Sequence, residues 1–105
     1  MIDRLEASAD ALWLTPHAED MVRIGFADDG REMVGAVKEI EWLKPAGRVL
    51  LGDPLMIVTG EQESLTLRFP FAGKIAAINP ELMAHPEYLN QHNDQLDWMV
   101  DLVVD

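Results

Sequence analysis

The sequence predicts a mainly β fold, a β-sandwich or small barrel with short helices, from three observations. About six or seven short apolar runs recur along the chain, and residues typical of turns separate them at close intervals. The hydrophobic fraction of 49% is that of a folded globular protein. A length of 105 residues suits one hydrophobic core, so we expect a single domain over residues 1–105.

The first third of the chain contains one ambiguous segment and one clear strand. The apolar side chains of residues 1–12 have rough helical spacing, but the stretch is short, so a helix and a loose N-terminal arm both stay open. Residues 21–26 are predicted to form a strand, which the Asp-Asp-Gly sequence at 28–30 ends by turn chemistry. A short helical turn over residues 31–34 is expected next.

The middle of the chain predicts four strands. The first of them alternates between apolar and polar residues, as a half-buried strand does, and a Pro-Ala-Gly turn follows it. The third is a continuous apolar run, typical of a strand buried on both faces. Polar residues 59–64 separate the third from the fourth, which predicts an exposed hairpin tip. The four segments are 36–43, 48–51, 55–58 and 65–69.

The last third predicts a strand, a late helix and a final strand. Residues 74–78 form the first strand, after a Pro-Phe-Ala-Gly turn. Asn79, Pro80 and Glu81 are an N-cap, a first-turn proline and a first-turn acid, so a helix is expected to begin there. Pro86 ends or kinks this helix, with one more turn possible over residues 87–89, and residues 98–104 form the final strand.

The charge of the chain excludes two classes of partner. Eight basic and nineteen acidic residues give a net charge of -11. Such a surface repels phosphate backbones and anionic membranes, so we expect neither nucleic-acid nor membrane binding. A positively charged protein partner is compatible with it, although the same charge also serves plain solubility.

Cysteine usage and the N-terminal sequence favour a cytoplasmic protein. The chain has no cysteine, which excludes disulfides, thiolate nucleophiles and Cys-based metal sites. The first ten residues carry acidic side chains instead of a basic cap and an apolar run, and therefore do not predict a signal peptide.

Taken in order, these elements resemble the H protein of the glycine cleavage system, a lipoyl carrier. The shared pieces are a strand, a short helix with a Gly-containing link, a Gly-Asp turn, a Pro-x-x-Gly turn, and a late segment with Asn, Pro-Glu-x-x-Asn and Trp. They correspond to residues 22–26, 34–35, 52–53, 70–73, 79–82, 86–90 and Trp98. The resemblance implies a lipoyl/biotinyl-carrier-like flattened β-sandwich (barrel-sandwich hybrid) with the lipoyl-lysine at a hairpin tip.

The attachment motif of that family is changed in this chain. Counting from either neighbouring turn aligns Glu-Ser-Val-Lys-Ala with Thr59, Gly60, Glu61, Gln62 and Glu63, so that Gln62 occupies the lipoyl-lysine position. A glutamine amide is not nucleophilic enough to form the amide with lipoate. We therefore expect no cofactor, and a tip at 59–63 that serves as a protein-docking surface, exposed because hairpin tips are.

The expected function is that of a non-lipoylated binding or regulatory module without a catalytic site. The resemblance implies lipoate-attaching or lipoate-transferring enzymes, or glycine cleavage enzymes, as partners. The alternative is a true lipoyl carrier of a glycine cleavage-like system, modified at another lysine. The remaining lysines are Lys38 in a predicted strand, Lys44 before a turn and Lys74 after Gly73.

Other chemistry has little support in the sequence. No phosphate-binding glycine loop or nucleophile elbow is present, and neither serine has an evident partner, so no catalytic residue is expected. A metal site would need three converging ligands, which the spacing of the histidines does not predict. The tryptophans are expected in the core, with a ligand pocket as the lesser alternative. These residues are His17, His85, His92, Trp13, Trp42 and Trp98.

Overall fold

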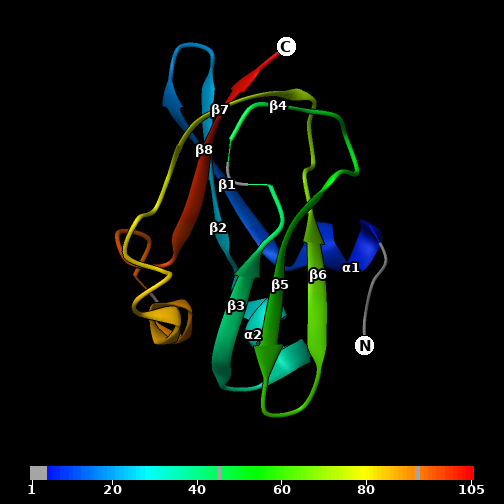
Figure 1. Ribbon diagram of the computed structural model, residues 1–105, viewed down its shortest axis with the longest axis vertical. Coiled ribbons are helices and arrows are strands. Elements are labelled where there is room, and N and C mark those ends of the chain that lie inside the picture. Colours follow the sequence, from blue (N-terminus) through cyan, green and yellow to red (C-terminus); the bar gives the residue numbers. More distant parts are fainter. Residues whose placement is uncertain (1–4, 45, 92) are drawn as a thin grey trace.

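Two antiparallel sheets make up the fold in the computed structural model, which describes residues 5–44, 46–91 and 93–105 (Figure 1). The five-stranded sheet has the order β1-β2-β8-β7-β4, and the three-stranded sheet has the order β3-β5-β6. The strands are β1 Leu12–Ala18, β2 Met21–Phe26, β3 Val37–Trp42, β4 Arg48–Val49, β5 Pro54–Gly60, β6 Ser64–Arg68, β7 Gly73–Ile78 and β8 Trp98–Val104. The helices are α1 Leu5–Asp10, α2 Asp28–Val34 and the 3-10 helix η1 Pro86–Asn90.

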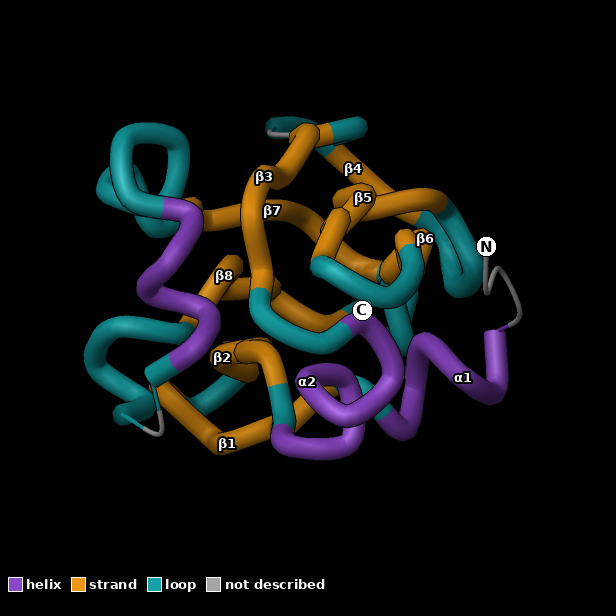
Figure 2. The backbone as a smooth tube through the Cα atoms, turned by 90° about the horizontal axis from the view of Figure 1, so that it is seen from below, coloured by secondary structure: helices purple, strands orange, loops and turns teal. Residues whose placement is uncertain are grey.

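The predicted flattened β-sandwich is confirmed. The molecule measures 36 × 26 × 19 Å along its principal axes, and its core lies between the sheets. Figure 2 shows α1 and α2 side by side at the edge of the two layers. Alternate positions of the strands fill the core because successive side chains of a strand point to opposite faces. Fully buried examples are Ile24 and Phe26 of β2, Leu65 and Leu67 of β6, and Val100 and Leu102 of β8.

The N-terminal segment forms both a helix and a strand. The open choice for residues 1–12 is decided in favour of a helix where the structure describes them, since α1 spans Leu5–Asp10 and contacts β6. The following strand β1 was not predicted, because Pro16 interrupts the apolar pattern. Proline is tolerated there because β1 is an edge strand of its sheet, and its pairing with β2 is irregular between Pro16 and Ala18.

Two helix predictions need correction. The Asp-Asp-Gly sequence at 28–30 does not form a loop after β2. It is the first turn of helix α2, where the negative charges of Asp28 and Asp29 interact favourably with the helix dipole. Gly30 is needed inside this helix because a Cβ atom there would lie 2.4 Å from the ring of Phe26. Residues 80–84 form hydrogen-bonded turns and not the helix predicted from Asn79.

The side chain of Asn79 links the end of β7 to the start of β8 and also makes the predicted cap contact. Its amide nitrogen donates to the carbonyl oxygens of Leu96 and Trp98, at 3.2 and 3.0 Å, while its oxygen accepts from the N–H of Glu81 at 3.1 Å. Asn79 is almost fully buried and joins the end of β7 to the start of β8. The late helix is instead η1, after Pro86.

Both edges of the three-stranded sheet are closed by single polar side chains. Asn90 of η1 accepts from the N–H of Val37 at 2.8 Å and donates to its carbonyl oxygen at 3.3 Å, as a neighbouring strand would. On the opposite edge, the hydroxyl of Ser8 accepts from the N–H of Arg68 at 2.6 Å and lies 3.3 Å from its carbonyl oxygen. These contacts protect edges that would otherwise expose unpaired backbone groups.

Asn90→Ala is expected to lower the free energy of unfolding by about 1 to 2 kcal/mol, because two hydrogen bonds to the β3 backbone are lost. Urea denaturation measures the loss, and hydrogen exchange at the Val37 amide locates it. Gln91→Ala is the control, since the exposed Gln91 side chain lies next to Asn90 and should change stability by less than about 0.5 kcal/mol. Equal stabilities of the two variants would contradict this role of Asn90.

Candidate functional site: a hairpin tip anchored to the α2–β3 link

The predicted hairpin tip lies where β5 turns into β6, at the bottom of Figure 1. Thr59 pairs with Ser64 as the last matched pair of the two strands, and their hydroxyl oxygens are 3.1 Å apart. Ser64 and Ser8 therefore both have hydrogen-bond partners that the sequence did not reveal. Glu61, Gln62 and Glu63 are exposed beyond this pair.

The tip backbone is bound to the link between α2 and β3. The N–H of Gln62 donates to the carbonyl oxygen of Val34 at 2.8 Å, and the N–H of Glu61 donates to the carbonyl oxygen of Ala36 at 3.0 Å. Within the tip, the N–H of Gly60 donates to Glu63 at 3.0 Å. The tip is thus exposed but held in place, and its side chains project from an ordered backbone.

Two glycines permit this close contact. A Cβ atom on Gly60 would lie 2.2 Å from the carbonyl oxygen of Val34, so no side chain fits there. Gly35 has a φ of 78°, a conformation that other residues adopt only with strain, and its Cα faces the side chain of Gln62. Glycine is therefore needed in the link after α2 because it allows the tip to approach the end of this helix.

The lysines differ in how close they lie to the tip. Lys38 is exposed and sits in the bulge of β3, between Val37, which pairs with Gly60, and Glu39, which pairs with Thr59. Lys38 is therefore next to the tip, closer than its place in a predicted strand suggested. Lys44 lies in the loop after β3 with its Nζ atom 3.7 Å from the carboxylate of Asp53, and Lys74 is exposed on β7.

The histidines do not converge in the described part of the chain. The Nε2 atom of His17 lies 3.2 Å from Arg23 Nη2, and His85 lies 3.1 Å from the carboxylate of Glu87 and stacks on Tyr88. His92 lies outside the described residues. Among the residues that the structure describes, no group of three metal-ligating side chains was found.

The tryptophans occupy different surroundings. Trp42 packs against the core, and Trp98 lies under the guanidinium of Arg23, 4.1 Å from its ring centroid. Trp13 lines a pocket of about 560 Å³ together with Phe26, Asp28, Arg31, Asp94 and Asp97. A ligand pocket was the lesser alternative for the tryptophans, and Trp13 lines a pocket, whereas Trp42 packs against the core as expected.

Asp97 is the buried charge of this pocket. It accepts from the indole N–H of Trp13 at 3.0 Å and from Arg31 Nη2 at 2.5 Å. Burial raises the pKa of the Asp97 carboxyl group and outweighs these hydrogen bonds, which act in the opposite direction. The sequence offers no signal for this group, because its partners lie 66 and 84 residues away along the chain.

Among the described residues, no helix is long and apolar enough to cross a membrane.

Comparison with known proteins places the chain beside one family. A family model described as "Glycine cleavage H-protein" matches residues 5–105. A glycine cleavage system H protein of Methylobacillus flagellatus is 28% identical over 88 residues, 84% of this chain and 72% of the relative. One of Mycobacterium bovis is 26% identical over 101 residues, 96% of this chain and 75% of the relative.

The fold has a counterpart among solved structures. The crystal structure of a glycine cleavage system H protein from Mycobacterium marinum superposes with a TM-score of 0.76. The match covers 91% of this chain and 80% of that chain at 20% sequence identity.

Proposed function

This chain belongs to the glycine cleavage H-protein family, and we propose that it acts there as a non-lipoylated binding or regulatory module. Proteins of this family are lipoyl carriers and not enzymes, so their function depends on which partners they dock to. The observation that carries the proposal is Gln62, which stands at the exposed tip between β5 and β6, where the resemblance puts the lipoyl-lysine.

The tip residues do not fit a lipoyl group. Lipoate is joined to its carrier through an amide bond, which requires a lysine amine. Residues 59–63 supply hydroxyl, amide and carboxylate groups and no amine. The tip nevertheless keeps an anchored backbone, because Glu61 and Gln62 are hydrogen-bonded to the α2–β3 link. A tip that stays ordered without the attachment residue supports a docking role.

The charge of the tip suggests which partner surface it meets. Glu61 and Glu63 are exposed on either side of Gln62. Carboxylates in this position favour a basic partner surface, through electrostatic complementarity that acts mainly on specificity and association rate. We propose lipoate-attaching or lipoate-transferring enzymes, or the enzymes of glycine cleavage, as partners of residues 59–63.

The test is co-expression with a lipoate ligase in the presence of lipoate, followed by intact-mass measurement. The native protein is expected to keep its unmodified mass, while Gln62→Lys gains one lipoyl group, because the ordered tip then presents an amine at its apex. Glu63→Lys is the matched control: it places a lysine one residue away and should stay unmodified.

Two outcomes of this experiment would overturn the proposal. A lipoyl group on the native protein would make it a carrier. An unmodified Gln62→Lys variant, with folding confirmed by circular dichroism, would show that the tip no longer has the geometry of an attachment site.

A carrier modified at Lys38 is the second candidate function. It is favoured by the bulge that places the exposed Lys38 beside Gly60 and Thr59 at the base of the tip. In this case the native protein gains a lipoyl group, peptide mapping finds it on Lys38, and Lys38→Arg abolishes it while Lys74→Arg does not.

We also propose that residues 1–105 act as a single domain of this family and that the protein works in the cytoplasm. The absence of cysteine from the sequence is compatible with a reducing compartment.

A further inference from the structure

A tight turn between β4 and β5 presents two leucines to solvent. Leu50 and Leu51 are 66% and 60% exposed, among the most exposed large apolar side chains of the described residues. The Asp53 carboxylate accepts from the N–H of Leu50 at 2.9 Å, and the N–H of Asp53 donates to the Leu50 carbonyl oxygen at 3.0 Å. Gly52 has a φ of 89°. These bonds order the backbone of residues 50–53, the leucine turn, from which both side chains project into solvent.

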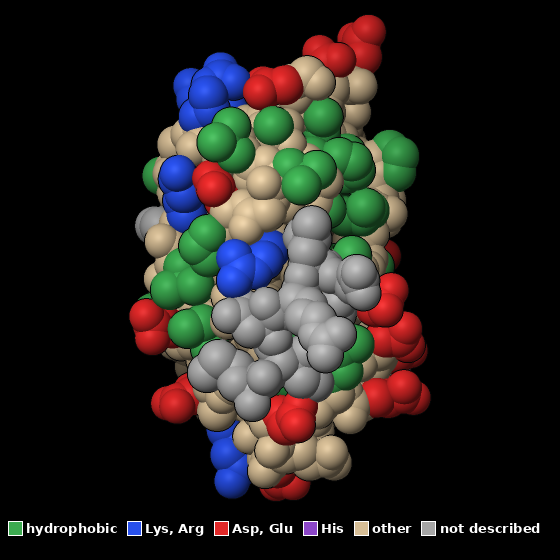
Figure 3. Space-filling view, turned by 90° about the vertical axis from the view of Figure 1, so that its right-hand side faces the viewer, with side chains coloured by type: hydrophobic (Ala, Val, Ile, Leu, Met, Phe, Trp, Pro, Cys, Tyr) green, Lys and Arg blue, Asp and Glu red, His purple; other side chains and the backbone are tan. Residues whose placement is uncertain are grey.

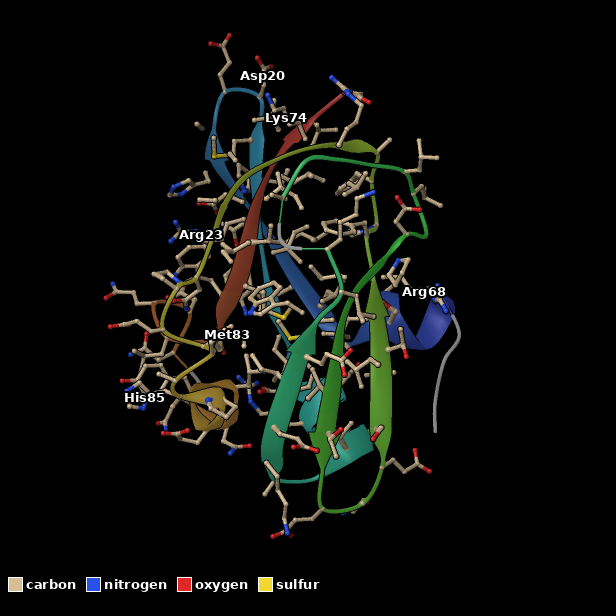
Figure 4. All side chains as sticks on the ribbon, viewed as in Figure 1. Asp20, Arg23, Arg68, Lys74, Met83 and His85 are labelled. Carbon is tan, nitrogen blue, oxygen red and sulfur yellow. The ribbon has the colours of Figure 1, made fainter. Side chains whose placement is uncertain are left out.

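Basic side chains surround the leucine turn. Arg68 Nη1 donates to the Gly52 carbonyl oxygen at 3.2 Å, Lys44 lies 3.7 Å from Asp53, and Arg48 precedes Leu50 by two residues and pairs with Asp105. Figure 4 shows Arg68 on the same side of the molecule as the β4–β5 loop. In Figure 3, hydrophobic side chains gather on the upper half of this face, beside both Lys or Arg and Asp or Glu side chains.

The pocket beside Trp13 has the opposite character. Its accessible aromatic wall is the partly exposed ring of Trp13, while Phe26 behind it is fully buried. Its polar lining includes the carboxylates of Asp28, Asp94 and Asp97 and the guanidinium of Arg31, which pairs with Asp28 and Asp97. A volume of about 560 Å³ lies within the usual range for ligand pockets, about 300 to 1,000 Å³.

Two glycines fix the walls of this pocket. A Cβ atom on Gly25 would lie 2.1 Å from the indole of Trp13, and one on Gly30 would lie 2.4 Å from the ring of Phe26. Each ring therefore rests directly on a glycine. The pocket is formed by close packing of the fold and does not require a ligand to open it.

We propose that the leucine turn of one molecule binds in the Trp13 pocket of a second copy of this chain. The leucines would contact the indole of Trp13, and Lys44, Arg48 and Arg68 would face the carboxylates of the pocket while keeping their contacts to Asp53, Asp105 and the Gly52 carbonyl oxygen. In a chain of net charge -11, three basic side chains and two acidic ones, Asp53 and Asp105, lie at this apolar turn, whereas three carboxylates and one guanidinium line the pocket. The inference does not depend on the state of the hairpin tip.

The geometry makes this contact heterologous and weak. The turn joins β4 to β5, whereas Trp13, Phe26 and Asp28 belong to β1, β2 and α2, so the two surfaces are different parts of the molecule. Every dimer would then keep one free turn and one free pocket, and chains would grow with concentration. Two leucines bury far less than a stable dimer needs, which predicts a dissociation constant on the order of 0.1 to 1 mM.

The test is sedimentation equilibrium of the full chain from about 10 µM to about 1 mM, a range that spans the expected dissociation constant. The native protein is expected to show a rising average mass. The turn variant Leu50→Asp/Leu51→Asp and the pocket variant Asp94→Lys should each remain monomeric. Their equimolar mixture should form dimers and nothing larger, because one intact turn then meets one intact pocket. Met83→Asp, at another exposed apolar residue that is 62% accessible, is the control and should associate like the native protein.

Several results would overturn the inference. A native protein that stays monomeric at every concentration would do so. So would self-association that Asp94→Lys leaves intact and only the turn variant abolishes, because this result assigns a symmetric contact between two leucine turns. Binding of the monomer to phosphatidylcholine vesicles, lost in the turn variant, would assign the leucines to a lipid surface.

Discussion

Asp97→Ala is expected to lower the free energy of unfolding by about 3 kcal/mol. Removing one partner of a buried ion pair has an effect of this size because it leaves the other charge buried without its partner. Asp97 is 3% exposed, and the Arg31 side chain that it pairs with is 13% exposed. Without the carboxylate, the charged partner that Arg31 keeps among the described residues is the exposed Asp28, besides two carbonyl oxygens. The indole N–H of Trp13 loses its acceptor as well.

Urea denaturation of three variants separates charge from hydrogen bonding. Asp97→Asn should lose less stability than Asp97→Ala, because the amide oxygen can still accept a hydrogen bond and no charge has to be desolvated. Asp94→Ala is the control at an exposed carboxylate of the same pocket, with an expected change within about 0.5 kcal/mol. If Asp97→Ala unfolded at the same urea concentration as Asp94→Ala, Asp97 would not stabilise the fold through its bonds to Arg31 and Trp13.

The same carboxyl group makes stability depend on pH. Burial raises the pKa of Asp97 above its ordinary value of 3.8, so the folded protein binds a proton at pH values where the unfolded chain has released it. The resulting stabilisation is fully present below the unfolded pKa and is lost as pH rises through the folded pKa. The stability of the native protein relative to Asp97→Asn should therefore fall as pH rises from about 4, the ordinary value for an aspartate. Urea titrations at a series of pH values measure this difference, and a difference independent of pH would contradict the prediction.

The strands could be predicted from the sequence where local pattern and turn chemistry agree. Residues 21–26 and 98–104 are confirmed as strands. The polar run 59–64 is confirmed as a hairpin, but its exposed tip is 61–63, because Thr59, Gly60 and Ser64 belong to the strands and are half-buried. Strand β1 could not be predicted, because Pro16 is acceptable only at a sheet edge and the sequence does not say which strand is at the edge. After Asn79 the predicted cap contact to Glu81 is present, but residues 80–84 form turns and the helix comes only after Pro86.

The position of the candidate site could be predicted from the sequence, but the long-range hydrogen bonds that anchor it could not. Gln62 could be placed at the tip from two neighbouring turns, whereas its bond to Val34 joins residues that are distant in sequence and depends on how β3 pairs with β5. The Trp13–Asp97 pair spans 84 residues and follows no pattern. Long-range polar contacts of this kind are set by tertiary packing, which local periodicity does not describe.

Gly60→Ala is expected to destabilise the protein by about 3 kcal/mol, at the upper end of the cost of overpacking, because the new Cβ would lie 2.2 Å from the Val34 carbonyl oxygen. That oxygen accepts the N–H of Gln62, so the substitution pushes the tip away from the end of α2 and breaks the contact that anchors it. The damage should be largest at the tip. Hydrogen exchange at the amides of Glu61 and Gln62 is therefore expected to accelerate more than exchange in β8, in addition to the loss measured by urea denaturation.

Gly52→Ala separates this collision from the general cost of replacing a glycine. Gly52 has a φ of 89° and no atom within 4 Å of its would-be Cβ, so only backbone strain of about 1 to 2 kcal/mol applies. The loss for Gly60→Ala should therefore exceed that for Gly52→Ala, and only Gly60→Ala should change exchange at Gln62. If the two losses were equal and exchange at Gln62 stayed slow, the tip would tolerate a side chain at residue 60. Its anchoring to α2 would then not explain why it stays ordered without the attachment lysine.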